Sequence, residues 1–181
     1  VGLLLPNSNT TVAVFLGLQV VNRTPAMLNF SSGPRNLLSA CKTARIRILL
    51  TSRRFVIQAK LEQTVESLRD TVTILFLENL AESISGGDKA RAFLLSLTVP
   101  LWYREGDSES AQKPAVILFT SGSEGEPKGV ALSHANLLAN REQLAARLDL
   151  NAQDTILNAL PMFHAFGLTA GTLLPLFYGM R

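Results

Sequence analysis

The chain has 181 residues, of which 47% are hydrophobic and 17% charged, and its formal net charge is +3. This composition is typical of a globular domain and excludes a disordered tail. The single cysteine, Cys41, cannot form a disulfide within the chain, and with only two histidines the sequence offers no ligand set for a structural zinc site. Basic residues are scattered with few aromatics among them, so we predict no nucleic-acid partner.

Two stretches, residues 1–22 and 156–180, carry no formal charge. Prolines, glycines and polar residues interrupt both, whereas a membrane-spanning helix needs about 20 consecutive, mostly apolar residues. We therefore expect buried strands, loops and helix starts here and no membrane span. No initiator methionine or charged signal-peptide flank precedes Val1, and the apolar sequence still continues near Arg181. We expect the chain to be a piece of a longer protein.

Strand and helix signals alternate along the first part of the chain. Short apolar or β-branched runs predict strands at residues 2–5, 25–29, 46–51 and 72–77. Apolar residues at helical positions predict helices at residues 11–21, 35–45 and 59–68. This alternation predicts an α/β fold with a layered, mostly parallel β-sheet flanked by helices.

The pattern loosens between residues 81 and 113, where glycines and a polar run predict a solvated excursion with a short helix around residues 91–97. Residues 115–119 form the most strand-like run and open directly into a glycine-rich segment. Ser133 then predicts the N-cap of a helix with apolar residues at helical spacing. Residues 156–160 predict one more strand, ended by proline.

The glycine-rich segment, residues 120–129, reads TSGSEGEPKG. Small residues after a buried strand can turn several backbone N–H groups and hydroxyls toward one point, and Lys128 can add a positive charge, which suits a polyphosphate. A plain surface turn is the alternative. A Walker loop is excluded because Pro127 stands where its second glycine belongs, and a dinucleotide fingerprint does not fit. A serine-hydrolase elbow would need glycine where the chain has Ser121.

The same ten residues match without a gap the phosphate-binding signature of the adenylate-forming family, Thr-Ser-Gly-Ser/Thr-x-Gly-x-Pro-Lys-Gly. Residues 160–168, LPMFHAFGL, are similar to that family's second segment at the expected distance. The whole chain, residues 1–181, thus resembles the N-terminal portion of an AMP-binding (adenylation) domain with its phosphate-binding loop at 120–129. Within the family, residues 25–30 and 130–134 are most similar to bacterial acyl-[acyl-carrier-protein] synthetases fused to a 2-acylglycerophosphoethanolamine acyltransferase.

The resemblance implies a ligase that uses ATP and Mg²⁺ to adenylate a long-chain fatty acid. The acyl group then passes to the thiol of acyl-carrier protein or CoA and feeds lysophospholipid reacylation. It also implies a parent protein at the cytoplasmic side of the bacterial inner membrane. The acyltransferase signature His-x-x-x-x-Asp is absent, because Ala139 and Thr169 occupy the acid position after the two histidines. The family's later segments are absent as well, so we expect this chain to need the missing C-terminal part for catalysis and to be prone to self-association.

The resemblance assigns roles to individual residues. The implied phosphate cradle consists of Thr120, Ser121, Gly122, Ser123, Gly125 and Lys128. Lys128 and His164 are the implied catalytic residues, and Thr120 is the implied hydroxyl near magnesium. The implied acyl site is lined by Phe163, His164 and Phe166. From the residues alone, a core histidine and core phenylalanines remain alternatives, and the role of Glu124 stays open.

Two other function classes remain open at this point. A non-catalytic nucleotide- or acyl-binding module would keep the loop without the chemistry. A membrane-interacting domain is suggested by the hydropathy and by the basic residues Arg53, Arg54 and Lys60. Liposome flotation and its salt dependence would expose the membrane alternative.

Overall fold

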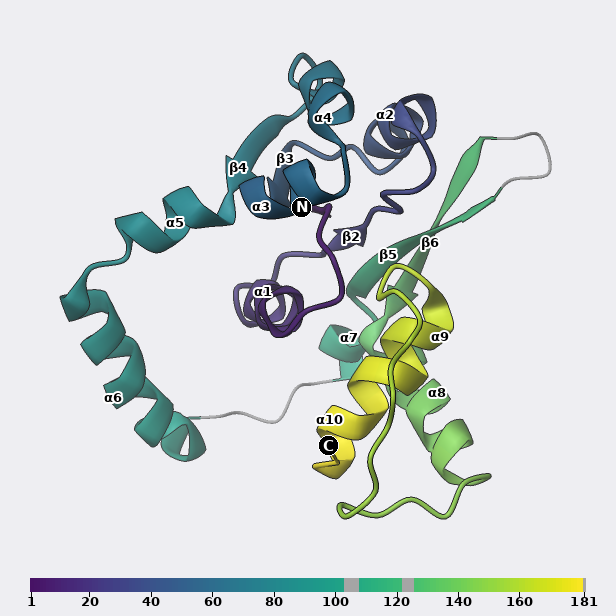
Figure 1. The fold of residues 1–181 in the computed structure, drawn as a ribbon. Helices are drawn as coiled ribbons and strands as arrows, with labels where there is room; N and C mark the ends of the chain where they lie inside the picture. The colour runs from purple at the N-terminus through teal and green to yellow at the C-terminus, as the bar shows by residue number, and fades with distance from the viewer. Residues whose placement is uncertain (103–107, 122–125, 181) are drawn as a thin grey trace.

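A six-stranded sheet forms the centre of the computed structural model, which describes residues 1–102, 108–121 and 126–180 (Figure 1). The strand order is β4-β3-β1-β2-β5-β6, in which β6 pairs antiparallel with β5 and all other neighbours are parallel. The strands are β1 Gly2–Leu3, β2 Ala26–Met27, β3 Ile48–Thr51, β4 Thr73–Phe76, β5 Pro114–Ser121 and β6 Pro127–Ser133. The predicted mostly parallel α/β fold is confirmed.

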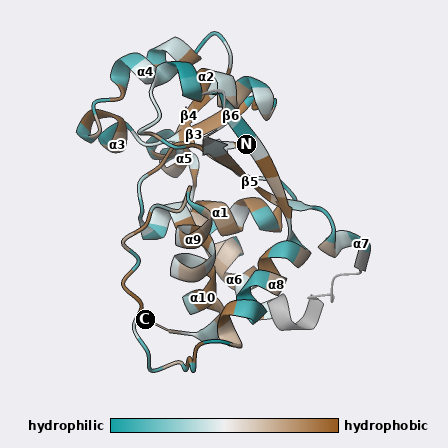
Figure 2. Ribbon diagram, turned by 90° about the vertical axis from the view of Figure 1, so that its right-hand side faces the viewer, coloured by the Kyte–Doolittle hydropathy of each residue, from teal (hydrophilic) through white to brown (hydrophobic). Residues whose placement is uncertain are grey.

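Helices cover both faces of the sheet, because alternate strand residues face opposite sides. Leu4 packs in one core cluster, whereas Leu3 and Leu5 pack in the other. The helices that pack on the Leu4 side are α2 Pro34–Thr43, α3 Arg53–Gln58 and α4 Glu62–Leu68. The helices that pack on the Leu3 side are α1 Asn9–Val20, α8 His134–Ala145 and α9 Ala165–Leu168. In Figure 2, β5 is coloured mostly as hydrophobic (brown), whereas the outer helix α4 carries hydrophilic (teal) residues. This distribution is expected for a buried sheet between two layers of helices.

Local sequence signals explain several helix ends. Ser133 caps α8 through a capping box with Asn136, as predicted. After α9 the chain continues through a π-helical turn, η1 Thr169–Leu173, into α10 Leu174–Tyr178. Gly179 ends α10 in the left-handed conformation with a φ of 67°, a value that glycine adopts without strain. On the opposite side of the sheet, burial raises the pKa of the Cys41 thiol to about 11, so this cysteine packs as a protonated apolar residue.

Two predicted elements are wrong. The helix expected over residues 59–68 begins only at Glu62, as α4, because Lys60 has a φ of 53° that no helix continues through. The short helix α3 before it was not predicted. The strand expected at residues 156–160 is absent: the segment is irregular, and Leu157 is 91% exposed. Within the described sheet no strand pairs with it, and an apolar run without a pairing partner does not become a strand.

The solvated excursion is more helical than the sequence predicted. It contains α5 Leu77–Ser83, α6 Gly86–Trp102 and the short α7 Ser108–Ala111. Figure 1 shows α5 leading away from the sheet and α6 standing apart from the other helices. Across the part of the chain that the structure describes, no helix combines the length and hydrophobicity needed to cross a membrane.

Candidate functional site

The two described ends of the glycine-rich segment form an antiparallel hairpin, which the sequence did not predict. Thr120 and Ser121 end β5, and they pair with Lys128 and Pro127 at the start of β6. The predicted cradle residues Gly122, Ser123 and Gly125, together with Glu124, lie outside the described residues. The β-ladder therefore fixes both ends of the loop and places Lys128 directly opposite Thr120.

Thr120 and Lys128 are both exposed at this end of the hairpin. Among the residues that the structure describes, Lys128 takes part in no ion pair. A lysine without a carboxylate partner leaves its full positive charge available to an incoming anion. The charge and the hydroxyl thus stand at the two ends of one loop, where both groups can bond an anion such as phosphate.

Two polar residues beside Thr120 were not predicted from the sequence. Asn29 and Ser32 line the same small cavity as Thr120, with a volume of about 110 Å³. Asn29 follows β2, and Thr120 lies near the end of the neighbouring parallel strand β5, so Asn29 and Thr120 both lie at the carboxyl edge of the sheet. Oδ1 of Asn29 accepts two hydrogen bonds from Ser31, one from its backbone N–H at 2.9 Å and one from its hydroxyl at 2.6 Å. The sequence signal that could have indicated Asn29 is a polar residue shortly after a predicted parallel strand, since ligands bind at the carboxyl ends of such strands.

Residues 160–164, named here the His164 segment, lie at the same edge of the sheet. The chain leaves β1 for a helix on one face and β2 for a helix on the other, which opens a crevice between the two carboxyl ends. Asn7, just after β1, donates from Nδ2 to the carbonyl oxygen of Leu160 at 2.8 Å. The backbone N–H of Met162 donates to Oδ1 of Asn7 at 2.9 Å. One side chain therefore satisfies the backbone on both sides of Pro161.

Aromatic packing holds the same segment from β2. Phe30 contacts Phe163 edge to face, with ring centroids 5.1 Å apart. Phe30 directly follows Asn29, which shares its cavity with Thr120. Residues 29 and 30 therefore relate the glycine-rich hairpin to the His164 segment, one through the shared cavity and the other through its ring contact, and the two predicted motifs lie at one edge of the sheet.

His164 is exposed and is the N-cap residue of α9. Its backbone N–H donates to the carbonyl of Pro161 at 3.0 Å, and its ring lies 4.7 Å from that of Phe163. Within the described residues its imidazole makes no hydrogen bond to protein, which is not the situation of a satisfied core histidine. Its catalytic and substrate-binding roles stay predictions.

The two phenylalanines of this motif have different environments. Phe163 is only 8% exposed and packs in the core on the α1 side, whereas Phe166 is 61% exposed. Phe163 therefore supports the segment from within, and Phe166 is free to contact a ligand. The acyl-lining role assigned to both remains a prediction.

Magnesium would find few ligands here. Among the described residues, no group of three or more His, Cys, Asp or Glu side chains could hold a metal ion. Thr120, assigned to magnesium on resemblance, offers one neutral hydroxyl. A magnesium ion at this site would have to take most of its ligands from phosphate oxygens and water, as Mg²⁺ commonly does.

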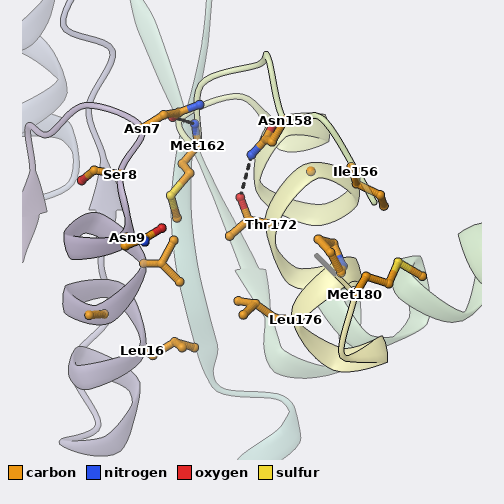
Figure 3. A pocket seen from close by; sticks show the side chains of 14 residues that line it. Asn7, Ser8, Asn9, Leu16, Ile156, Asn158, Met162, Thr172, Leu176 and Met180 are labelled. Atoms are coloured by element: carbon orange, nitrogen blue, oxygen red, sulfur yellow. Dashed lines mark hydrogen bonds between the residues drawn. The ribbon is translucent and has the colours of Figure 1, made fainter. Parts of the chain in front are cut away.

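A cleft of about 590 Å³ lies beside the His164 segment, between α1 and α10 (Figure 3). Its apolar lining residues include Val12, Leu16, Ile156, Met162, Leu176 and Met180. At one end, Asn158 donates from Nδ2 to Oγ1 of Thr172 at 3.0 Å. The cleft has the size and composition of a small-molecule pocket. No local sequence pattern indicates this cleft, because its walls are about 140 residues or more apart along the chain.

Two curated ligases match part of the chain. A medium-chain fatty-acid–CoA ligase of Escherichia coli (strain K12) is 46% identical over 67 residues, which is 37% of this chain and 12% of the ligase. The chloroplastic long-chain-fatty-acid–[acyl-carrier-protein] ligase AEE15 of Arabidopsis thaliana is 38% identical over 86 residues, which is 48% of this chain and 12% of the ligase.

A solved structure matches nearly the whole chain. It is the o-succinylbenzoate CoA synthetase of Bacillus subtilis with its acyl-adenylate intermediate, with a TM-score of 0.75 at 23% identity over 99% of this chain. The chain spans 41% of that structure, so it is less than half as long as this relative. The same synthetase has been solved with ATP and magnesium ion. The model of the AMP-binding enzyme family matches residues 1–181. The chain therefore belongs to the AMP-binding enzyme family, the adenylate-forming enzymes.

Proposed function

We propose that this chain is the N-terminal part of an ATP-dependent ligase that adenylates a long-chain fatty acid and transfers the acyl group to the thiol of acyl-carrier protein or CoA. The observation that carries the proposal is that the glycine-rich hairpin and the His164 segment lie at the same edge of the sheet. Membership of the AMP-binding enzyme family supports the reaction class. The matches to a fatty-acid–CoA ligase and an acyl-carrier-protein ligase support the substrate and acceptor classes.

The described residues fit a nucleotide phosphate chain. Lys128, exposed and without an ion-pair partner among the described residues, would neutralise phosphate charge, and the hydroxyl of Thr120 would donate a hydrogen bond. His164 would hydrogen-bond the reacting carboxylate or an α-phosphate oxygen, since its imidazole is exposed at the same edge. When bound, ATP with Mg²⁺ supplies an electrophilic phosphorus and a pyrophosphate leaving group.

The cleft beside the His164 segment supports an apolar substrate. An alkyl chain there would contact Val12 and Leu16 on one wall and Leu176 on the other. If so, Ala13→Phe, which adds a ring to the cleft wall, shortens the preferred fatty acid. Val20→Phe adds the same ring to the same helix at a position that is 80% exposed and does not line the cleft. Equal chain-length profiles in the two variants would place the alkyl chain elsewhere.

The biological setting is a further part of the proposal. Because the relatives are much longer, we propose that catalysis uses sequence beyond residue 181 of the same polypeptide. The similarity of residues 25–30 and 130–134 to acyl-carrier-protein synthetases fused to an acyltransferase favours a role in lysophospholipid reacylation at the cytoplasmic face of the bacterial inner membrane. Measuring acyl transfer from the carrier protein to a lysophospholipid by the natural protein tests the proposed role in reacylation.

ATP–pyrophosphate exchange in the natural protein that carries this sequence tests the adenylation step. We expect exchange that requires a long-chain fatty acid and falls about a hundredfold or more in Lys128→Ala, the order of loss seen when a transition-state charge partner is removed. Lys113→Ala is the matched control, because Lys113 is exposed at the opposite end of the same hairpin. His164→Ala is expected to lower exchange as well.

Three results are informative. Fatty-acid-dependent exchange lost in Lys128→Ala and kept in Lys113→Ala supports the proposal. Equal losses in both variants would mean that general electrostatic attraction, and not the loop, is responsible. Folded protein that binds ATP without fatty-acid-dependent exchange would favour the binding-module alternative.

A further inference from the structure

Helix α6 presents an apolar stripe that nothing in the described structure covers. Phe93, Leu94 and Leu97 are 64%, 62% and 63% exposed. With the exposed Ala90, these residues recur at the spacing i, i+3, i+4 and i+7, which places them on one side of a helix. Single exposed apolar residues are ordinary, but a continuous stripe of this kind marks an interaction surface.

The first turn of the helix is stabilised locally. The hydroxyl of Ser85 accepts from the backbone N–H of Asp88 at 3.1 Å, and the carboxylate of Asp88 accepts from the backbone N–H of Ser85 at 2.9 Å. This is a capping box, in which two otherwise unpaired backbone donors at the helix start are satisfied. Such a helix can stand away from the sheet, as Figure 1 shows, and keep its stripe available.

The charges on α6 select its partner. Lys89 and Arg91 are exposed and, at 100° per residue, lie on opposite flanks of the stripe. The only acidic residue of the helix, Asp88, has its carboxylate engaged by Ser85. An apolar stripe between two basic flanks fits the boundary between acyl chains and anionic headgroups, where long basic side chains extend toward phosphate.

Other occupants fit less well. A second copy of α6 would need acidic groups to pair with Lys89 and Arg91, and residues 92–102 contain none. The helix has 17 residues and is too short to cross a membrane. Arg53, one of the basic residues that the sequence suggested for membrane contact, is occupied elsewhere, because its guanidinium lies 4.3 Å from the ring centroid of Phe76.

We propose that α6 is an interfacial helix that lies in the surface of an anionic lipid bilayer, with Ala90, Phe93, Leu94 and Leu97 toward the acyl chains. This surface is independent of the nucleotide site. It would bring the acyl-activating site of the proposed ligase to the membrane surface.

The experiment mixes the whole chain with phosphatidylcholine vesicles that contain or lack phosphatidylglycerol, and records co-sedimentation. We expect co-sedimentation with the anionic vesicles, and much weaker binding to phosphatidylcholine alone. Binding that is equally strong to both would overturn the role of the basic flanks.

Matched variants separate the stripe from net charge. Phe93→Asp should weaken vesicle binding about tenfold or more, since it removes an aromatic ring from the proposed membrane-facing stripe and places a carboxylate among acyl chains. Ala92→Asp adds the same charge to an exposed position on the other side of α6 and should have a clearly smaller effect. Equal losses in the two variants would contradict insertion of the stripe.

A second pair tests the basic flanks. Replacing Lys89 and Arg91 by glutamine should weaken binding to anionic vesicles about tenfold or more, as two basic side chains at a membrane surface contribute that order. Replacing Arg35 and Lys42 on α2 removes the same charge from another exposed surface and should leave most of the binding intact. The proposal also fails if the wild-type chain shows no vesicle binding, or if sedimentation equilibrium shows a dimer that Phe93→Asp abolishes and lipid does not displace.

Discussion

The His164 segment and helix α6 are built in opposite ways. The His164 segment has its conformation imposed by distant residues, since Asn7 bonds its backbone at Leu160 and Met162 across separations of 153 and 155 residues. Helix α6 is stabilised by its own first turn and leaves an apolar stripe exposed. The comparison indicates that the site is assembled by tertiary contacts, whereas the proposed membrane surface is encoded locally.

The largest change in stability is expected from the comparison of Phe163 with Phe166. Phe163→Ala removes a core ring that contacts Phe30, and we expect it to lower the free energy of unfolding by about 3 kcal/mol. Phe166→Ala removes an exposed ring and should change stability by no more than about 0.5 kcal/mol. Urea denaturation of both variants measures the difference. Similar values would show that the His164 segment is not held from the core.

Two glycines give the next contrast. A Cβ at Gly167 would lie 2.3 Å from the carbonyl oxygen of Pro161, so Gly167→Ala must displace the His164 segment, at a cost of about 2 kcal/mol. A Cβ at Gly17, inside α1, would meet no atom within 4 Å. Gly17→Ala should therefore stabilise the protein by about 0.5–1 kcal/mol through helix propensity. Thermal denaturation should show shifts of opposite sign, and a shared sign would contradict the close approach at Gly167.

Asn7 tests the hydrogen bonds that hold the same segment. Asn7→Ala leaves the Leu160 carbonyl and the Met162 N–H without this partner, and we expect a loss of about 1.5 kcal/mol. Asn9→Ala changes the same side chain two residues later, at an exposed position on the same cleft, and should cost less.

Activity gives a second measurement on Asn7. In the natural protein, Asn7→Asp keeps the acceptor for Met162 but sets a carboxylate oxygen against the Leu160 carbonyl oxygen, so adenylation should fall in this variant as well as in Asn7→Ala. An Asn7→Ala variant with full activity and full stability would rule out a positioning role.

The smallest effect concerns the cap of α6 and depends on pH. The side-chain and backbone hydrogen bonds from Ser85 hold the pKa of Asp88 below its ordinary value of 3.8. Because the folded-state pKa is lowered, this stabilisation is present above the unfolded-state pKa and is lost as the pH falls through the folded-state value. Ser85→Ala should increase amide exchange in α6 at neutral pH and leave the global unfolding midpoint unchanged. The excess should be smaller once Asp88 is protonated, because the wild-type cap then keeps mainly the bond from the Asp88 N–H to the Ser85 hydroxyl. A shifted global midpoint would mean that α6 packs against the sheet.

Much of the fold followed from local patterns. Short apolar runs that alternate with segments of helical periodicity predicted the mostly parallel α/β fold, and Ser133 predicted the start of α8. The motifs at residues 120–129 and 160–168 predicted family membership, because each can be recognised from the order of its residues alone. These features depend on neighbours within a few residues, which the sequence displays directly.

Tertiary structure decided the rest. Residues 156–160 have the composition of a strand but find no pairing partner in the described sheet, and the continuous helical pattern at residues 59–68 is broken by the left-handed backbone at Lys60. The placement of Asn29 beside Thr120, the bonds of Asn7 to the His164 segment and the cleft between α1 and α10 all join residues far apart in the chain. Such contacts follow from strand order, and strand order is a property of the whole sheet and not of any one segment.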